Sequence, residues 1–182
     1  MCKRVVAGAM AVSLLACTEQ SPTGPIETRA LDVTTEAEPH KVAKRTKARP
    51  GATRVSATFD RRGGTLTAEG VTLIVPAGAL TSKKKITLYV PPGDALSAEF
   101  EPHGLQFLVP VQIGFTLTDT EFTLETATTE LIGAYHVQDP VNGVVVPNEV
   151  MSVGVNGNYV MFSTWHFSKY SLLLKGIILL GG

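Results

Sequence analysis

The seven residues 111–117, VQIGFTL, carry the clearest strand pattern in the chain, because apolar residues occupy every second position. Alternate side chains along a β-strand point to opposite faces, so Val111, Ile113, Phe115 and Leu117 would share one face. Such alternation is typical of a strand with one face against a hydrophobic core and the other toward solvent. We therefore take a half-buried strand at this place as the starting point for the fold.

Short apolar or alternating segments continue on both sides of this strand. Further strands are expected at residues 55–59, 65–67, 71–75, 86–90, 131–137, 144–146, 151–155, 159–165 and 169–174. Turn residues separate them, as at 91–94 (PPGD) and 156–158 (NGN). Helical structure is expected only at 77–80 and within 119–130. Many short strands at this spacing predict an all-β fold, an antiparallel β-sandwich of short strands.

The N-terminus has the pattern of a bacterial export signal. Lys3 and Arg4 precede the mostly apolar residues 5–16, a run too short for a membrane-spanning helix, which needs about 20 residues. The run ends in Leu14-Leu15-Ala16-Cys17, which resembles the lipobox of bacterial lipoproteins. That resemblance implies that residues 1–16 are a signal peptide and that Cys17 becomes the acylated N-terminus, anchored to the membrane. A plain signal peptide with an incidental cysteine is the alternative.

Composition bears on the compartment and on the class of partner. Cys2 and Cys17 are the only cysteines, so the expected folded domain has no disulfide although the protein is exported. Thr18 follows Cys17 at the position where an aspartate would retain a lipoprotein in the inner membrane. The absence of aspartate there favours an outer-membrane location if the organism is Gram-negative. Without residues 1–16 the chain has 14 basic and 16 acidic residues. This balance argues against a nucleic-acid-binding protein, which would be strongly basic.

Residues 17–54 predict a disordered linker that begins at the lipidated cysteine. Residues 31–50 are polar and charged, with almost no apolar periodicity, and such a segment buries too little apolar surface to fold. Its second half is basic and contains Lys41, Lys44, Arg45, Lys47 and Arg49. We interpret the linker as a tether. The basic part is either a solvated charge run or a contact with anionic lipid or cell-wall polymer.

The folded domain is then expected over residues 55–182, and three stretches within it resemble a known family. They are GGTL at 63–66 followed by VTLIVPAGAL at 71–80, GLQF at 104–107 with PVQI at 110–113, and WHFSKY at 165–170. In this order they resemble the ZU-five domain of zonula occludens protein, netrin receptors and ankyrins. The resemblance implies a β-sandwich that serves as a protein-interaction module.

The same resemblance implies a possible reaction. Some family members cut themselves between Phe and Ser of a His-Phe-Ser segment, and the matching residues here are His166, Phe167 and Ser168. On one strand His166 and Ser168 would share a face, so the imidazole could act as general base on the hydroxyl. The hydroxyl would attack the Phe167 carbonyl and form an ester that water cleaves. The alternative is structural: Trp165 and Phe167 pack inward while His166 and Ser168 are half exposed.

Other functional patterns are sparse. The chain has no phosphate loop, nucleophile elbow or pattern of metal ligands, so we expect no cofactor, no metal and no small-molecule substrate. His40 falls in the linker, and His103 and His136 lie in separate segments. Lys83–Lys85 is interpreted as a solvated edge or as a contact for an acidic partner.

The sequence therefore predicts a lipid-anchored module at the cell envelope that binds a protein partner. Self-cleavage after Phe167 is the first alternative. A wall- or carbohydrate-binding sandwich is the second, and it would need several exposed aromatic side chains on one face. Trp165 is expected in the core rather than on such a face.

Overall fold

The computed structural model describes residues 38–177 of the chain. The predicted signal peptide, the lipidation site Cys17 and the first part of the predicted linker, to residue 37, lie outside the described residues. Residues 178–182 lie outside them as well. Among the described residues, no helix is long and apolar enough to cross a membrane.

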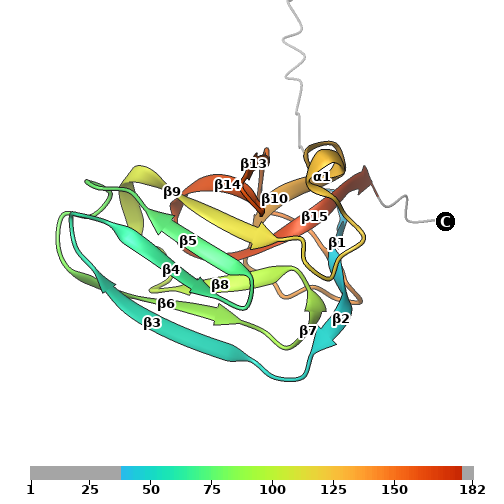
Figure 1. The fold of residues 1–182 in the computed structure, drawn as a ribbon, viewed down its shortest axis with the longest axis horizontal. Coiled ribbons are helices and arrows are strands. Elements are labelled where there is room, and N and C mark those ends of the chain that lie inside the picture. Colours follow the sequence, from blue (N-terminus) through green and yellow to red (C-terminus); the bar gives the residue numbers. More distant parts are fainter. Residues whose placement is uncertain (1–37, 178–182) are drawn as a thin grey trace, which may run out of the picture. The chain divides into compact units, whose positions relative to one another are not determined.

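Fifteen strands and one short helix make up this part of the chain (Figure 1). The first eight strands are β1 (His40–Val42), β2 (Lys44–Arg49), β3 (Thr53–Phe59), β4 (Gly64–Ala68), β5 (Val71–Val75), β6 (Lys84–Val90), β7 (Gly93–Ala95) and β8 (Ser97–Glu101). The remaining elements are β9 (Gln106–Thr116), α1 (Leu124–Glu130), β10 (Leu131–His136), β11 (Val144–Val145), β12 (Glu149–Met151), β13 (Gly154–Asn156), β14 (Tyr159–His166) and β15 (Lys169–Ile177).

The strands form two main sheets and a small ribbon, and every pairing is antiparallel. The larger sheet has the order β11-β1-β15-β8-β6-β3, and β10, which itself pairs with β12, joins the other side of β15. The smaller sheet has the order β13-β14-β9-β5-β4, and β2 pairs with β7. Figure 1 shows β4, β5 and β9 lying over β3, β6 and β8. The predicted antiparallel β-sandwich is confirmed.

Strand β9 is the centre of the smaller sheet, because it pairs with β5 on one side and β14 on the other. Val111, Ile113 and Phe115 are fully buried, which confirms the inward face predicted from their alternation. They pack with inward residues of the larger sheet such as Phe100 and Tyr170 to form the main core. Burial of this apolar surface is the main source of stability in such a fold.

Helix α1 confirms the helical segment expected within 119–130. Thr123 caps its N-terminus: its hydroxyl accepts a hydrogen bond from the Thr126 amide, and the Thr126 hydroxyl accepts one from the Thr123 amide. Such a reciprocal box satisfies amide groups that the first helical turn leaves unpaired. Ala127 is buried against the core.

The predicted linker boundary is wrong, because the sandwich begins near residue 40 rather than at residue 55. Strand β1 pairs with β11 and with β15, and its Val42 belongs to a second apolar cluster with Ala134, Val145 and Leu173. The sequence pattern missed β1 and β2 because single apolar residues among many charges carry no periodic signal.

The strand expected at residues 169–174 is confirmed as β15. β15 lies inside the larger sheet, with β10 along one side and β8 followed by β1 along the other. Leu172 and Leu173 are both fully buried, and they face opposite sides of the sheet: Leu172 joins the main core and Leu173 the second cluster.

Candidate functional site

The His-Phe-Ser segment lies where the chain passes from the smaller to the larger sheet. β14 ends at His166 and β15 begins at Lys169, so Phe167 and Ser168 connect two sheets. His166 and Ser168 therefore do not lie on one strand, as the same-face argument required. Phe167 is buried and stacks on Phe100, as the structural alternative expected. Ser168, expected to be half exposed, has only 7% of its surface accessible.

The His166 ring faces groups other than Ser168. Its Nδ1 lies 3.3 Å from the Tyr170 hydroxyl and its Nε2 lies 3.6 Å from a Glu149 carboxylate oxygen. Within residues 38–177, no hydrogen bond joins His166 to Ser168. The Phe167 carbonyl accepts a hydrogen bond of 3.0 Å from the Gly104 amide, which would polarise it in any attack on that carbon. The cleavage hypothesis is untested by this geometry and stays a prediction.

Trp165 is on the surface, which makes the expectation that it lies in the core wrong. Its exposed fraction is 54%, because it points away from the core between the inward residue Thr164 and His166. The β9–β14 register is irregular here: Thr164 pairs with Val111 and His166 with Gln106, which places residues 107–110 opposite Trp165. Leu108, in this stretch, is 66% exposed. We call Trp165, Leu108 and Val109 the tryptophan patch.

The remaining aromatic side chains are partly or fully buried. Trp165 is the only exposed one in the part of the chain that the structure describes. A sugar-binding face is built from several exposed aromatic rings, so the arrangement favours a protein partner over a carbohydrate. An exposed tryptophan beside exposed aliphatic residues is typical of the centre of a protein–protein interface.

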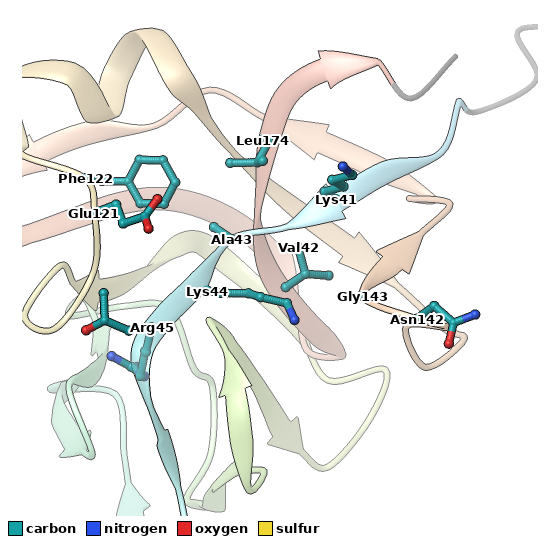
Figure 2. Close-up of a pocket in the computed structure, with 11 residues that line it drawn as sticks. Lys41, Val42, Ala43, Lys44, Arg45, Glu121, Phe122, Asn142, Gly143 and Leu174 are labelled. Atoms are coloured by element: carbon teal, nitrogen blue, oxygen red, sulfur yellow. The ribbon is translucent and has the colours of Figure 1, made fainter. Parts of the chain in front are cut away.

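A cleft runs beside β1 and β2, in the segment that the sequence assigned to the linker (Figure 2). Its walls come from these strands, from the loop before α1, from the loop between β10 and β11, and from β15. Figure 2 shows Arg45, Glu121 and Phe122 at one end of the cleft and Lys41 and Asn142 at the other. Phe122 and Leu174 are partly buried apolar side chains of the wall, whereas Lys44 pairs with Asp94 at 3.0 Å.

Arg45 is the unusual residue of this cleft. Its strand position turns its side chain inward, so only 8% of it is accessible. Its Nε and Nη2 atoms are buried, and no atom of the described residues accepts a hydrogen bond from them. Burial, helped by the neighbouring Arg49 charge, lowers the pKa of the Arg45 guanidinium to about 10, so it remains charged at neutral pH. Unpaired buried donors of this kind are rare in proteins.

A second hollow lies on the outer face of the larger sheet, between residues 89–95 and the loop after β10. His136, Ser171 and Ser97 form a buried hydrogen-bonded chain beside it. His136 Nδ1 donates to the Gln138 carbonyl at 2.7 Å, so the neutral ring accepts the Ser171 hydroxyl on Nε2 at 2.8 Å. Ser97 Oγ lies 2.7 Å from Ser171 Oγ.

Burial lowers the pKa of the His136 imidazole below its ordinary value, and the Lys169 charge adds to this effect. The ring is therefore neutral near pH 7, and all three polar groups of the chain are satisfied by one another or by backbone. We interpret this chain as a structural element under the second hollow. Sequence reasoning placed His136 in an isolated segment because its side-chain partner, Ser171, lies 35 residues further along the chain.

One cluster of potential metal ligands was not expected from the sequence. Ligand atoms of Glu99, Glu101 and His103 lie within 4.8 Å of one another. However, Glu101 forms an ion pair of 2.8 Å with Arg54, and His103 Nε2 lies 2.6 Å from Glu99. These pairings account for the cluster without an ion.

The other residues noted in the sequence have simple environments. Lys83–Lys85 are exposed, with the last two at the start of β6, as expected of a solvated edge. His40 is on β1 rather than in a linker, and its Nδ1 lies 2.9 Å from the Leu174 carbonyl. No structural feature relates to Cys17, which lies outside the described residues.

Comparison with known families gives one match. The model of the ZU5 domain family matches residues 55–121, from β3 to the loop before α1. This confirms the resemblance predicted from the glycine pair and the central strands, over less than half of the chain. The segment 165–170, the third stretch of the resemblance, lies beyond the matched range. A search of curated proteins finds no match to this chain.

Proposed function

We propose that this chain, whose residues 55–121 match the ZU5 domain, is a lipid-anchored protein of the cell envelope that presents its β-sandwich to a protein partner. ZU5 domains generally mediate protein–protein interactions, and the fold supports such a module. The observation that carries the proposal is the tryptophan patch, because a large exposed aromatic side chain beside exposed aliphatic ones favours a partner surface.

A photo-cross-linking experiment in cells tests the binding surface. A photoreactive phenylalanine analogue replaces Trp165 or Leu108 in the full chain, and Lys85, exposed on the other sheet, serves as the control position. We expect a discrete higher-mass adduct from positions 165 and 108 and none from position 85. Adducts of equal yield from all three positions, or from none, would contradict the tryptophan patch as the binding surface.

Lipid anchoring is supported by the lipobox-like sequence that ends at Cys17. Cells grown with an alkyne-bearing palmitate analogue should label the wild-type protein and the Cys2→Ser variant but not the Cys17→Ser variant. Cys2 is the matched control because it would leave with the signal peptide. Labelling that is undiminished in Cys17→Ser would place the acyl chain at another residue. Fractionation of labelled outer and inner membranes then tests the predicted outer-membrane location.

Self-cleavage after Phe167 is a second candidate, favoured by the amide of Gly104 that donates to the Phe167 carbonyl. It would leave residues 168–182 held by the pairing of β15. The test is the intact mass, under denaturing conditions, of residues 18–182 beside Ser168→Ala and the exposed control Ser163→Ala. Loss of the last 15 residues in wild type and Ser163→Ala, but not in Ser168→Ala, would establish the reaction. Full-length masses in all three would remove it.

A further inference from the structure

We infer that the cleft beside β1 and β2 binds a carboxylate group of a partner polypeptide, with Arg45 as the anchoring residue. The inference rests on the proposed protein-binding function and names the chemistry of the partner segment. It concerns a surface different from the tryptophan patch, since its residues come from β1, β2, β15 and two loops.

The unpaired atoms of Arg45 form a ready binding edge. Nε and Nη2 lie on the same side of the planar guanidinium, and their two N–H groups are parallel. This is the edge that binds both oxygens of a carboxylate in a bidentate pair. Three other arginines of the described residues already contact carboxylates: Arg49 with Glu69, Arg54 with Glu101, and Arg62 with Asp60. Arg45 has the same chemistry and, within residues 38–177, lacks the anion.

The unpaired edge of Arg45 has to move before it can reach a ligand in the cleft. In the ligand-free chain Nε and Nη2 are covered, so the guanidinium has to turn to offer them to a ligand. Arg45 also lines a separate hollow with Arg49, Glu69 and Asp119, and the charges of all three act on its guanidinium: Arg49 disfavours its positive charge, whereas Asp119 and Glu69 favour it. An anion in the cleft would give these unpaired donors an acceptor.

The charges of the cleft fit a monoanion better than a phosphate dianion. Lys44 is neutralised by Asp94, which leaves Lys41 and Arg45 against Glu121. Among the charged residues that line the cleft, the remaining charge is a single positive one, which one carboxylate would balance. A dianion would bring an excess negative charge close to Glu121, at a cost in Coulomb energy.

The shape of the cleft favours a polypeptide over a free small acid. It extends along β1 and β2 from Arg45 to Lys41, and its wall includes the partly buried apolar residues Phe122 and Leu174. An aspartate or glutamate side chain could reach Arg45 while a neighbouring apolar side chain of the same segment packs on Phe122. A short apolar-acidic sequence is therefore the ligand that the cleft would select.

The experiment follows the Nε–H signal of Arg45 by nuclear magnetic resonance in the full ¹⁵N-labelled chain, purified in detergent. The probes are acetate, N-acetyl-aspartate amide, inorganic phosphate and chloride, each at the same ionic strength. Arg45→Lys keeps the charge and removes the bidentate edge, and Arg62→Lys is the matched control at an exposed arginine. We expect a saturable downfield shift of this signal with both carboxylates. In the variants the affinity is read from the backbone amide signals of residues 41–46, and it should be about tenfold weaker in Arg45→Lys but unchanged in Arg62→Lys.

Several results would overturn the inference. An equal shift with chloride would indicate general screening, and phosphate binding tighter than carboxylate would assign the cleft to a phosphate-bearing ligand. A bonded Nε–H signal in the ligand-free chain that no probe changes would mean that the chain itself fills the site. If Arg45→Lys fails to fold, the titration of the wild-type signal decides alone. Because these probes do not involve Trp165, failure here and failure of the cross-linking test are distinguishable.

Discussion

The two most informative single residues are buried polar ones, Arg45 and His136. Neither shows a motif in the sequence, and each is defined by what surrounds it. For Arg45 the surroundings supply no acceptor within the described residues, whereas for His136 they supply a carbonyl and a hydroxyl in the correct positions for a neutral ring. The surroundings of Arg45 indicate a ligand. The surroundings of His136 indicate that the stability of the fold depends on pH.

We expect the protein to lose stability as the pH falls below about 6.5. Burial lowers the pKa of folded His136 below the ordinary value of 6.5, so below that pH the unfolded chain binds a proton that the folded chain does not. The contribution is fully present above pH 6.5 and disappears as the pH falls toward the folded pKa. Lys169 opposes protonation and Asp139 favours it.

Urea unfolding at pH 7.5 and pH 5.5 measures this effect. The variant His136→Gln keeps a side-chain acceptor for Ser171 and has no group that titrates there, so its stability should fall less between the two pH values. His103→Gln, at an exposed histidine, serves as the control for the loss of a titrating side chain. An identical pH dependence in wild type and His136→Gln would assign the acid sensitivity to other groups.

At the scale of elements, the connection between β3 and β4 depends on a glycine. Gly63 has a φ of +74°, and a Cβ there would overlap the Val75 carbonyl of the neighbouring strand β5. Replacement by alanine is therefore strained by its conformation and blocked by backbone at once. We expect Gly63→Ala to lower the free energy of unfolding by roughly 1–3 kcal/mol, measured by chemical denaturation.

Gly51→Ala is the matched control for this prediction. Gly51 lies in the connection before β3, and a Cβ there meets no atom within 4 Å. The stability of the Gly51→Ala variant should remain close to that of wild type or rise slightly, since alanine restricts the conformations of the unfolded chain. Equal losses at both positions would show that the β3–β4 connection tolerates a side chain.

At the scale of the whole molecule, packing of the two sheets requires close approach at Gly133. An alanine Cβ at this position of β10, in the larger sheet, would lie 2.5 Å from the Phe162 ring of β14 in the smaller one. We expect Gly133→Ala to destabilise the fold by about 1–3 kcal/mol, as overpacking does. In the control Gly154→Ala the added Cβ has open space, and thermal unfolding should change little.

The N-terminal strands provide a second test at this scale. A chain that begins at Glu38 retains β1 and β2, whereas one that begins at Val55 exposes Leu173 and an unpaired side of β15. We expect the shorter chain to be less stable by at least about 3 kcal/mol or to aggregate, because it loses the burial of Val42 and one strand pairing. Equal denaturation midpoints for both chains would restore the sequence-based boundary at residue 55.

The sequence by itself determined the features that depend on near neighbours. Alternation at Val111, Ile113 and Phe115 identified β9, turn residues separated the other strands, and the glycine pair and central strands identified the ZU5 match. These signals are local, because backbone conformation and the inward face of a strand depend on a few adjacent residues. Strands with weak alternation, such as β8 and the charged β1 and β2, were missed.

The tertiary structure alone decided which distant residues meet. It placed Trp165 on the surface, separated His166 from Ser168 by a change of sheet, and joined His136 to Ser171 and Ser97. It also buried Arg45. Residues 41–50 contain five basic residues, and this composition had predicted that Arg45 belongs to a solvated linker. Burial and pairing arise from contacts between strands far apart in the chain, and no periodicity within one segment encodes them.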